Sequence, residues 1–228
     1  ISEAQLTYYK HHACPSCGAC SFMGTAGTMQ VMCEALGLTL PGSALLPATS
    51  ADLVEVARKA GAQAVELAKR GLTARDIVTR ESFENAIIVH AAISGSTNAI
   101  LHLPAIAHEA DVDLNMEIAN EMSAKTPNLC HLAPAGPTYM EDLNEAGGVY
   151  AVMNELNKKN LLNTDLITVT GKTVGENIAG CINRNPEVIR PIDNPYSEIG
   201  GIAVLKGNLA PEGAVVKHSA VPKEMHVA

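Results

Sequence analysis

The sequence predicts an α/β fold in which helices flank a partial sheet, with a short β-rich tail at the C-terminus. Apolar residues recur at helical spacing through most of the chain before position 160, and alternating apolar residues follow near its end. Aromatic residues make up only 3% of the 228 residues. The core must therefore consist mainly of Ala, Leu, Ile, Val and Met, which suits helices packed on a sheet.

Helices are expected in seven segments. Ser50 is placed to N-cap the second, which ends before Gly71. Either Thr79 or Ser82 opens the third, and Gly95 is expected to end it. Pro104 is expected to kink the fourth helix or to mark its true start. The seven segments are 25–36, 51–70, 82–93, 98–110, 115–125, 140–146 and 149–159.

The character of the sequence changes after position 182. Three prolines in the run INRNPEVIRPIDNP predict a linker over 183–196. Beyond it, two strands are expected around a Pro211-Glu212-Gly213 turn, and one earlier strand is expected over 165–170. We therefore expect one α/β domain over 1–182 and the start of a β domain over 197–228.

Composition and charge argue against several functions. A formal net charge of −8 disfavours a nucleic-acid binder, which would gather Lys and Arg on one face. No run approaches the roughly 20 apolar residues of a membrane helix. The start has neither a basic nor an apolar signal region and lacks an initiator Met, so we expect a cytoplasmic protein whose first residue is a cut.

Three of the six cysteines, Cys14, Cys17 and Cys20, lie within seven residues. This clustering in a long chain disfavours disulfides and favours a reducing cytosol with metal chemistry. Soft thiolates before a helix suit zinc or an iron-sulfur cluster. Position 24 is Gly rather than a fourth cysteine, and zinc would need further ligands such as His12. Unligated packed thiols remain the alternative.

Four longer motifs of the sequence resemble those of a known enzyme family. The segments CPSCGACSFMGTAGTMQVMCEALGLTLPGSALLPA, FENAIIVHAAISGSTNAILHLPAIAHEA, TYMEDLNEAGGVYAVMNEL and DLITVTGKTVGEN occur in this order. Together they resemble the family of dihydroxy-acid dehydratases and 6-phosphogluconate dehydratases. The match covers nearly the whole chain, so it is far more specific than any single CxxC spacing.

The resemblance implies an iron-sulfur cluster, [2Fe-2S] or [4Fe-4S], whose iron acts as a Lewis acid, and a nearby Mg²⁺. The reaction would dehydrate a 2,3-dihydroxy acid to the 2-keto-3-deoxy acid. In the family the last cysteine of the loop ligates the cluster, which corresponds to Cys20. Cys14 and Cys17 do not correspond to ligands, although their spacing alone would suggest one site that uses all three thiols.

The family's Gly-Ser-Thr-Asn motif corresponds to Gly95, Ser96, Thr97 and Asn98, where one predicted helix ends and the next begins. Its N–H groups and hydroxyls could hold a substrate carboxylate or line the cluster pocket. The alternative is an ordinary helix cap. Thr25, after the cluster cysteine, is expected either to reach substrate or only to cap its helix.

Other polar residues are expected to be structural. Isolated cysteines and helical histidines are more often packed than functional, and acidic residues in a first helical turn usually complement the helix dipole. This set comprises Cys33, Cys130, Cys181, His90, His102, His108, His131, Glu141 and Asp142.

The resemblance also implies what the chain lacks. A Cys-Asp-Lys motif that binds the divalent metal would precede Ile1, and the base serine would follow Ala228. We therefore expect an internal fragment, inactive by itself, of an enzyme that forms a homodimer or larger assembly.

Two questions stay open. The string CSFMGTA favours a sugar acid such as an aldonate, and the alternative substrate is the 2,3-dihydroxy-isovalerate of branched-chain amino-acid biosynthesis. A rival function class is a non-catalytic zinc-binding module that uses Cys14, Cys17, Cys20 and His12.

Overall fold

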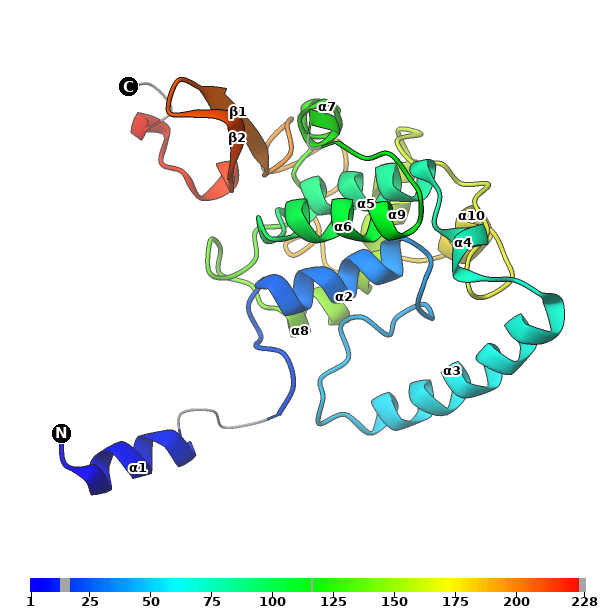
Figure 1. Cartoon of the computed structure of the whole chain (residues 1–228), viewed down its shortest axis with the longest axis horizontal. Helices are drawn as coiled ribbons and strands as arrows, with labels where there is room; N and C mark the ends of the chain where they lie inside the picture. Colours follow the sequence, from blue (N-terminus) through cyan, green and yellow to red (C-terminus); the bar gives the residue numbers. More distant parts are fainter. Residues whose placement is uncertain (13–16, 116, 226–228) are drawn as a thin grey trace.

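The computed structural model describes residues 1–12, 17–115 and 117–225. Helices dominate these residues, and a small sheet lies near the C-terminus (Figure 1). The elements are α1 (Glu3–His12), α2 (Thr25–Ala35), α3 (Ala51–Arg70), α4 (Ala74–Ile77), α5 (Arg80–Ile93), α6 (Ala99–Glu109), α7 (Glu117–Lys125), α8 (Met140–Glu145), α9 (Gly148–Asn157), α10 (Val174–Ile178), β1 (Ala203–Gly207) and β2 (Ala210–Val216), followed by 3-10 turns at His218–Ala220 and Lys223–Met225.

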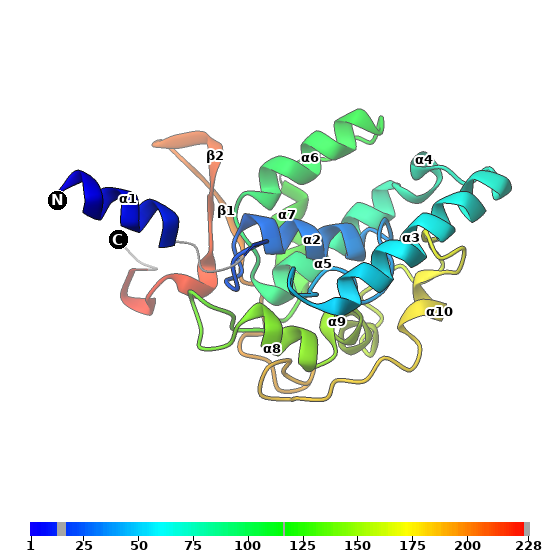
Figure 2. The same cartoon turned by 90° about the horizontal axis from the view of Figure 1, so that it is seen from below.

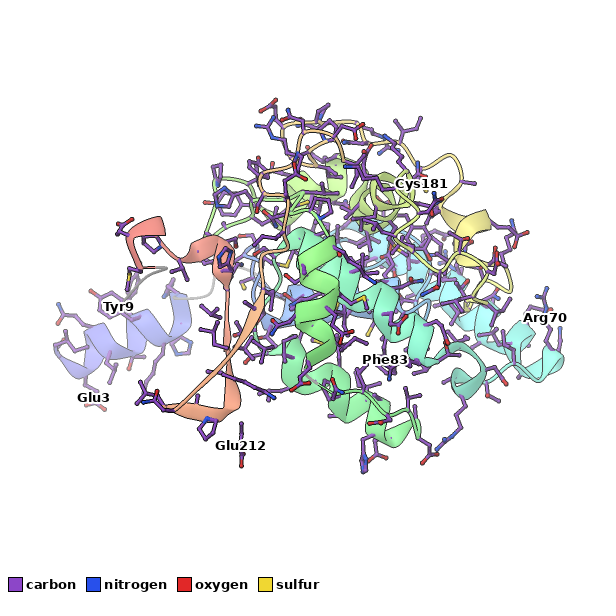
Figure 3. The ribbon with its side chains drawn as sticks, turned by 90° about the horizontal axis from the view of Figure 1, so that it is seen from above. Glu3, Tyr9, Arg70, Phe83, Cys181 and Glu212 are labelled. Atoms are coloured by element: carbon purple, nitrogen blue, oxygen red, sulfur yellow. The ribbon has the colours of Figure 1, made fainter. Side chains whose placement is uncertain are left out.

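Helix α5 forms the centre of the body. It is buried on all sides from Ser82 to Ile93 except at Glu84, as its almost uninterrupted apolar sequence predicts. Helices α2, α6, α7 and α9 pack around it. Phe83, which is fully buried, lies among the side chains of this body in Figure 3. Burying a phenylalanine contributes about 2–3 kcal/mol, so α5 anchors the fold.

The seven predicted helices are all present, and their caps explain most of their ends. Ser50 accepts the Asp52 N–H at 3.1 Å, and Gly71 ends α3 in the left-handed region with φ 68°. Thr79 is the N-cap of α5, because its hydroxyl and that of Ser82 exchange hydrogen bonds with each other's backbone N–H.

One detail at the end of α5 differs from prediction. Ser94, not Gly95, takes the left-handed conformation that ends α5, with φ 53°. Pro104 lies inside α6, so of its two expected roles only the kink remains a prediction. The short helices α4 and α10 and the N-terminal α1 were not predicted, because the first two have too few turns to show an apolar period.

The α/β class is confirmed, with the sheet limited to an antiparallel β1–β2 hairpin. The turn lies at Asn208-Leu209, not at Pro-Glu-Gly. Pairing passes from Leu205↔Ala214 to Gly207↔Ala210, so the intervening Pro211-Glu212-Gly213 forms a bulge in β2. The expected strand over 165–170 is also absent, since this segment makes only the single bridge Ile167↔Thr173.

Hydrogen bonds attach the hairpin to α7. The Asn120 amide donates to the Val204 carbonyl and accepts the Val204 N–H, both at 2.7 Å. Ser123 Oγ donates to the Ile202 carbonyl at 2.7 Å. A two-stranded hairpin is marginal alone, so these bonds and the burial of Val204 hold the tail on the helical body.

The predicted linker, 183–196, has no helix or strand but is not a free tether. Val188, Ile189 and Ile192 are buried in the core, and the Arg190 N–H donates to the Leu129 carbonyl at 2.8 Å. The division of the chain into two domains at this segment stays a prediction.

Two helices lie at the edge of the body. No residue of α1 or α3 is buried. Helix α1 stands away from the α5 bundle in Figures 1 and 2, and α3 lies at the edge of the body in Figure 1. The amphipathic pattern of α3 therefore predicted a helix without predicting its burial. None of the helices in the described parts of the chain combines the length and the apolar character of a membrane span.

Replacing Asn120 by Ala should weaken the attachment of the tail. Both main-chain groups of Val204 lose a partner, so we expect the free energy of unfolding to fall by about 2 kcal/mol. Urea unfolding would measure this, and limited proteolysis should release the hairpin sooner. His108→Ala, on the exposed side of α6, is the control; equal stability of the two variants would contradict the role of Asn120.

Candidate functional site

The cysteine loop leads directly into α2. Cys17 and Cys20 are both exposed, and Cys14 lies outside the described residues. A Cβ built on Gly24, the N-cap of α2, would lie 3.7 Å from Cys20 Sγ. The Cys20 sulfur is thus at the helix N-terminus, where the helix dipole favours a negatively charged ligand such as a thiolate.

The segment 42–48 packs against this cysteine loop. Gly18 has φ 93°, and a Cβ there would meet the Ala48 Cβ at 2.4 Å, so only glycine fits. The buried Glu34 carboxylate holds the supporting segment by accepting the N–H groups of Gly42 at 2.8 Å and Ala44 at 2.9 Å. Burial raises the pKa of Glu34, and these hydrogen bonds partly offset it.

A cavity of about 130 Å³ lies beside Cys20. Glu141 is its only acidic lining residue among the described part of the chain, whereas Asp142 caps α8 by accepting the Tyr139 N–H at 2.7 Å. The lining residues are Gly18, Ala19, Cys20, Ser21, Gly27, Gln30, Ser43, Ala44, Leu45, Leu46, Pro47, Ala48, Leu53, Met140 and Glu141.

The turn from Gly95 to Asn98 is held from two sides. Thr28 of α2 accepts the Ser96 N–H at 2.9 Å, and His90 of α5 approaches the Ser96 carbonyl with Nε2 at 2.9 Å. Because a carbonyl only accepts, His90 Nε2 must carry the proton. The tertiary fold therefore fixes this turn at both the N–H and the C=O of one residue.

Hydroxyl and amide groups meet where this turn faces α2. Asn98 Nδ2 donates to Thr25 Oγ1 at 2.6 Å, and Thr25 Oγ1 lies 3.3 Å from Ser96 Oγ. The structure thus brings together three of the five residues predicted to bind substrate. Thr25 does not cap α2, whose N-cap is Gly24, and Thr97 contributes no side-chain hydrogen bond within the described residues.

The buried His90 was expected to be structural, and its surroundings explain why it remains neutral. Burial lowers its pKa to about 4, and the nearby Lys217 charge acts in the same direction, while the hydrogen bond to Ser96 opposes them. Its role in holding the turn could not be found from the sequence, which shows only a lone histidine on an apolar helix.

The remaining expected structural residues fall into two groups. Burial raises the pKa of Cys33, Cys130 and Cys181, that of Cys130 to about 12, as expected for packed thiols. His102 and His108 are exposed on α6. Within the described residues no three His, Cys, Asp or Glu side chains gather as a metal site.

An exposed thiol at a helix N-terminus, beside a turn lined with hydroxyls, defines a candidate metal-dependent enzyme site. The model of the dihydroxy-acid/6-phosphogluconate dehydratase N-terminal domain matches residues 1–177, and that of the C-terminal domain matches residues 187–228. The chain belongs to this dehydratase family, which confirms the resemblance seen in its motifs.

The chain is similar over almost its whole length to curated proteins of this family. Proteins named dihydroxy-acid dehydratase are 60% identical over 227 residues in Lachnoclostridium phytofermentans, 58% over 225 residues in Clostridium kluyveri and 56% over 227 residues in Agathobacter rectalis. The matches cover 99–100% of this chain but only 40–41% of each relative. These relatives are named for a dihydroxy acid, so they do not support the expected sugar-acid preference, and the family favours an enzyme over a zinc-binding module.

Adding a methyl group at Gly95 should damage the turn. A Cβ there would lie 2.4 Å from His90 Cδ2 and 2.9 Å from Thr28 Cγ2, so Gly95→Ala should cost about 1–3 kcal/mol of stability. Gly61→Ala, in open space on α3, should instead stabilise the chain by about 0.5–1 kcal/mol. Chemical denaturation of both variants tests this; effects of the same sign would count against the steric explanation.

Acid should destabilise the chain through His90. Its folded pKa of about 4 lies below the ordinary value of 6.5, so the stability it contributes is present above pH 6.5 and is lost as the pH falls toward 4. The loss should approach about 3 kcal/mol. Urea unfolding between pH 7 and 4 should show a shallower pH slope for His90→Asn than for the exposed control His108→Asn. Identical slopes would rule out this contribution.

Proposed function

We propose that this chain is a segment of a longer dihydroxy-acid dehydratase, and that it carries one cluster thiolate and a substrate-binding turn. The chain spans about two fifths of the length of the curated relatives described above, which are named for this activity. The observation that carries the proposal is the meeting of the start of α2, next to Cys20, with Ser96 and Asn98. We refer to the longer protein as the parent enzyme.

The proposed reaction removes water from a 2,3-dihydroxy acid. A proton leaves C2, the C3 hydroxyl leaves with its bonding electrons as hydroxide, and the resulting enol tautomerises to the 2-keto acid. We propose 2,3-dihydroxy-isovalerate as substrate, because the relatives are named dihydroxy-acid dehydratases. A sugar acid such as an aldonate is disfavoured for the same reason.

The donor set fits one ligand of an iron-sulfur cluster. Cys20 has an exposed thiol next to a cavity, so it would hold one iron of a [2Fe-2S] or [4Fe-4S] cluster. When bound, the cluster supplies a Lewis acid for the departing hydroxyl. The described residues do not fit a Mg²⁺ site. We propose that ligands for Mg²⁺, the other cluster ligands and the base serine belong to other parts of the parent enzyme.

The turn can orient substrate through its remaining donors. Thr25 and Ser96 share one hydrogen bond between two hydroxyls, so one hydroxyl proton stays available in the described structure. Thr97, which follows Ser96 in the turn, is a half-buried residue with a further hydroxyl. These groups could donate to the oxygens of an acid or a hydroxyl without disturbing Ser96, which α2 and α5 hold in place.

The setting of the parent enzyme is also a proposal. The acidic balance and the clustered free thiols favour a small-molecule enzyme of the cytoplasm rather than a nucleic-acid binder. We further propose a homodimer or larger assembly, and a first domain over 1–182 joined by 183–196 to a β domain that starts at 197.

Substituting Cys20 by Ser in the parent enzyme should abolish cluster retention and dehydration, because an alcohol is a poor iron ligand. Cys17→Ser is the matched control, since it replaces another exposed thiol of the same loop. It should retain the visible absorption of the cluster and most of the activity. Iron and sulfide content, visible spectra and keto-acid formation are the measurements. An essential Cys17 together with a dispensable Cys20 would exclude the proposed ligand.

A further inference from the structure

A second cavity, of about 460 Å³, lies where the C-terminal tail meets the loop between α7 and α8. This volume is in the range of small-molecule sites. Its described lining contains no acidic side chain. The lining residues are His131, Pro134 and Ala135 from the loop and Lys217, Ser219, Ala220, Val221 and Pro222 from the tail.

Lys217 is the charged group of this cavity. Its side chain is half-buried, and burial lowers the pKa of its ammonium. No carboxylate of the described residues lies within ion-pair distance of it, whereas Lys158, Lys159 and Lys206 each pair with an acid. Partial burial of an unpaired cation is costly, and an anion bound in the cavity would offset the cost.

Short contacts connect this cavity with the candidate functional site. The Met23 N–H, three residues after Cys20, donates at 2.8 Å to the carbonyl of Ala133, which precedes the cavity residue Pro134. On the tail side, the hydroxyls of Ser219 and Ser94 are hydrogen-bonded. The tail and the loop lie at the end of the body where α2 begins (Figures 1 and 2).

Lys217 also interacts electrostatically with the residue that holds the turn. Lys217 is close enough for its positive charge to act on His90, the residue that donates to the Ser96 carbonyl. The cavity cation and the main chain of the turn therefore both interact with one buried imidazole.

We propose that Lys217 is a substrate-binding residue whose ammonium receives the carboxylate of the dihydroxy acid in the cavity of residues 131–135 and 217–222. This inference rests on the proposed function, because it takes the substrate to be a 2,3-dihydroxy acid. A carboxylate has two oxygens, so contact with Lys217 leaves the second oxygen free for another partner.

The test removes the negative charge from the ligand and, separately, the positive charge from residue 217. The probes are 2-oxoisovalerate, the keto acid expected from the reaction, and its neutral primary amide, each titrated calorimetrically into the parent enzyme. The variants are Lys217→Met, Lys217→Arg and the control Lys206→Gln, which removes an exposed lysine from β1. KM and kcat for 2,3-dihydroxy-isovalerate and the visible absorption of the cluster are measured in parallel.

Wild type and Lys206→Gln should bind the acid more tightly than the amide, by on the order of tenfold. Lys217→Met should lose this preference while its affinity for the amide is unchanged, and Lys217→Arg should restore part of it. KM should rise about tenfold in Lys217→Met, with cluster absorption retained. The unchanged amide affinity separates loss of a charge contact from loss of folding.

Opposite results would overturn the proposal. Retained acid preference in Lys217→Met would show that Lys217 does not bind the carboxylate, and an unchanged KM would show that any carboxylate bound there is not that of the substrate. A parent enzyme that dehydrates no dihydroxy acid, yet binds the keto acid through Lys217, would refute the proposed function and the substrate assignment but leave the anion site. The two failures are therefore distinguishable.

Discussion

The candidate site depends on how the main chain of Ser96 is held. Its N–H donates to Thr28 of α2 and its carbonyl accepts from the buried His90 of α5, so two helices fix one residue of an irregular turn. His90 can do this because burial keeps its imidazole neutral. Without both bonds, the turn would have no fixed position relative to the start of α2 and its cysteine.

The same principle, in which side chains satisfy backbone N–H and C=O groups, recurs around the site. Glu34 accepts two N–H groups of the segment behind the cysteine loop, and Asn120 holds both main-chain groups of Val204 in the tail. Segments outside the helices are thereby fixed to the helical body. Segments 17–24, 95–98 and 131–135 and the tail consequently meet at one end of the body.

The described residues bring together groups that suit an enzyme site, although no set of three metal-ligating side chains lies among them. The described residues contribute an exposed thiol, a group of hydroxyls and a half-buried cation. Groups of this kind suit cluster ligation, hydroxyl recognition and carboxylate recognition respectively. We propose that the missing ligands and the base come from the remainder of the parent enzyme.

The sequence by itself determined seven of the helices and the family, because apolar period, capping residues and contiguous motifs are local signals. Only the tertiary structure decided that Pro211-Glu212-Gly213 is a bulge, that α3 buries no residue, and that Ser94 rather than Gly95 ends α5. It also decided that Thr25 meets Asn98 and that Lys217 lies near His90. Such contacts join residues 73 and 127 positions apart, and no local pattern records them.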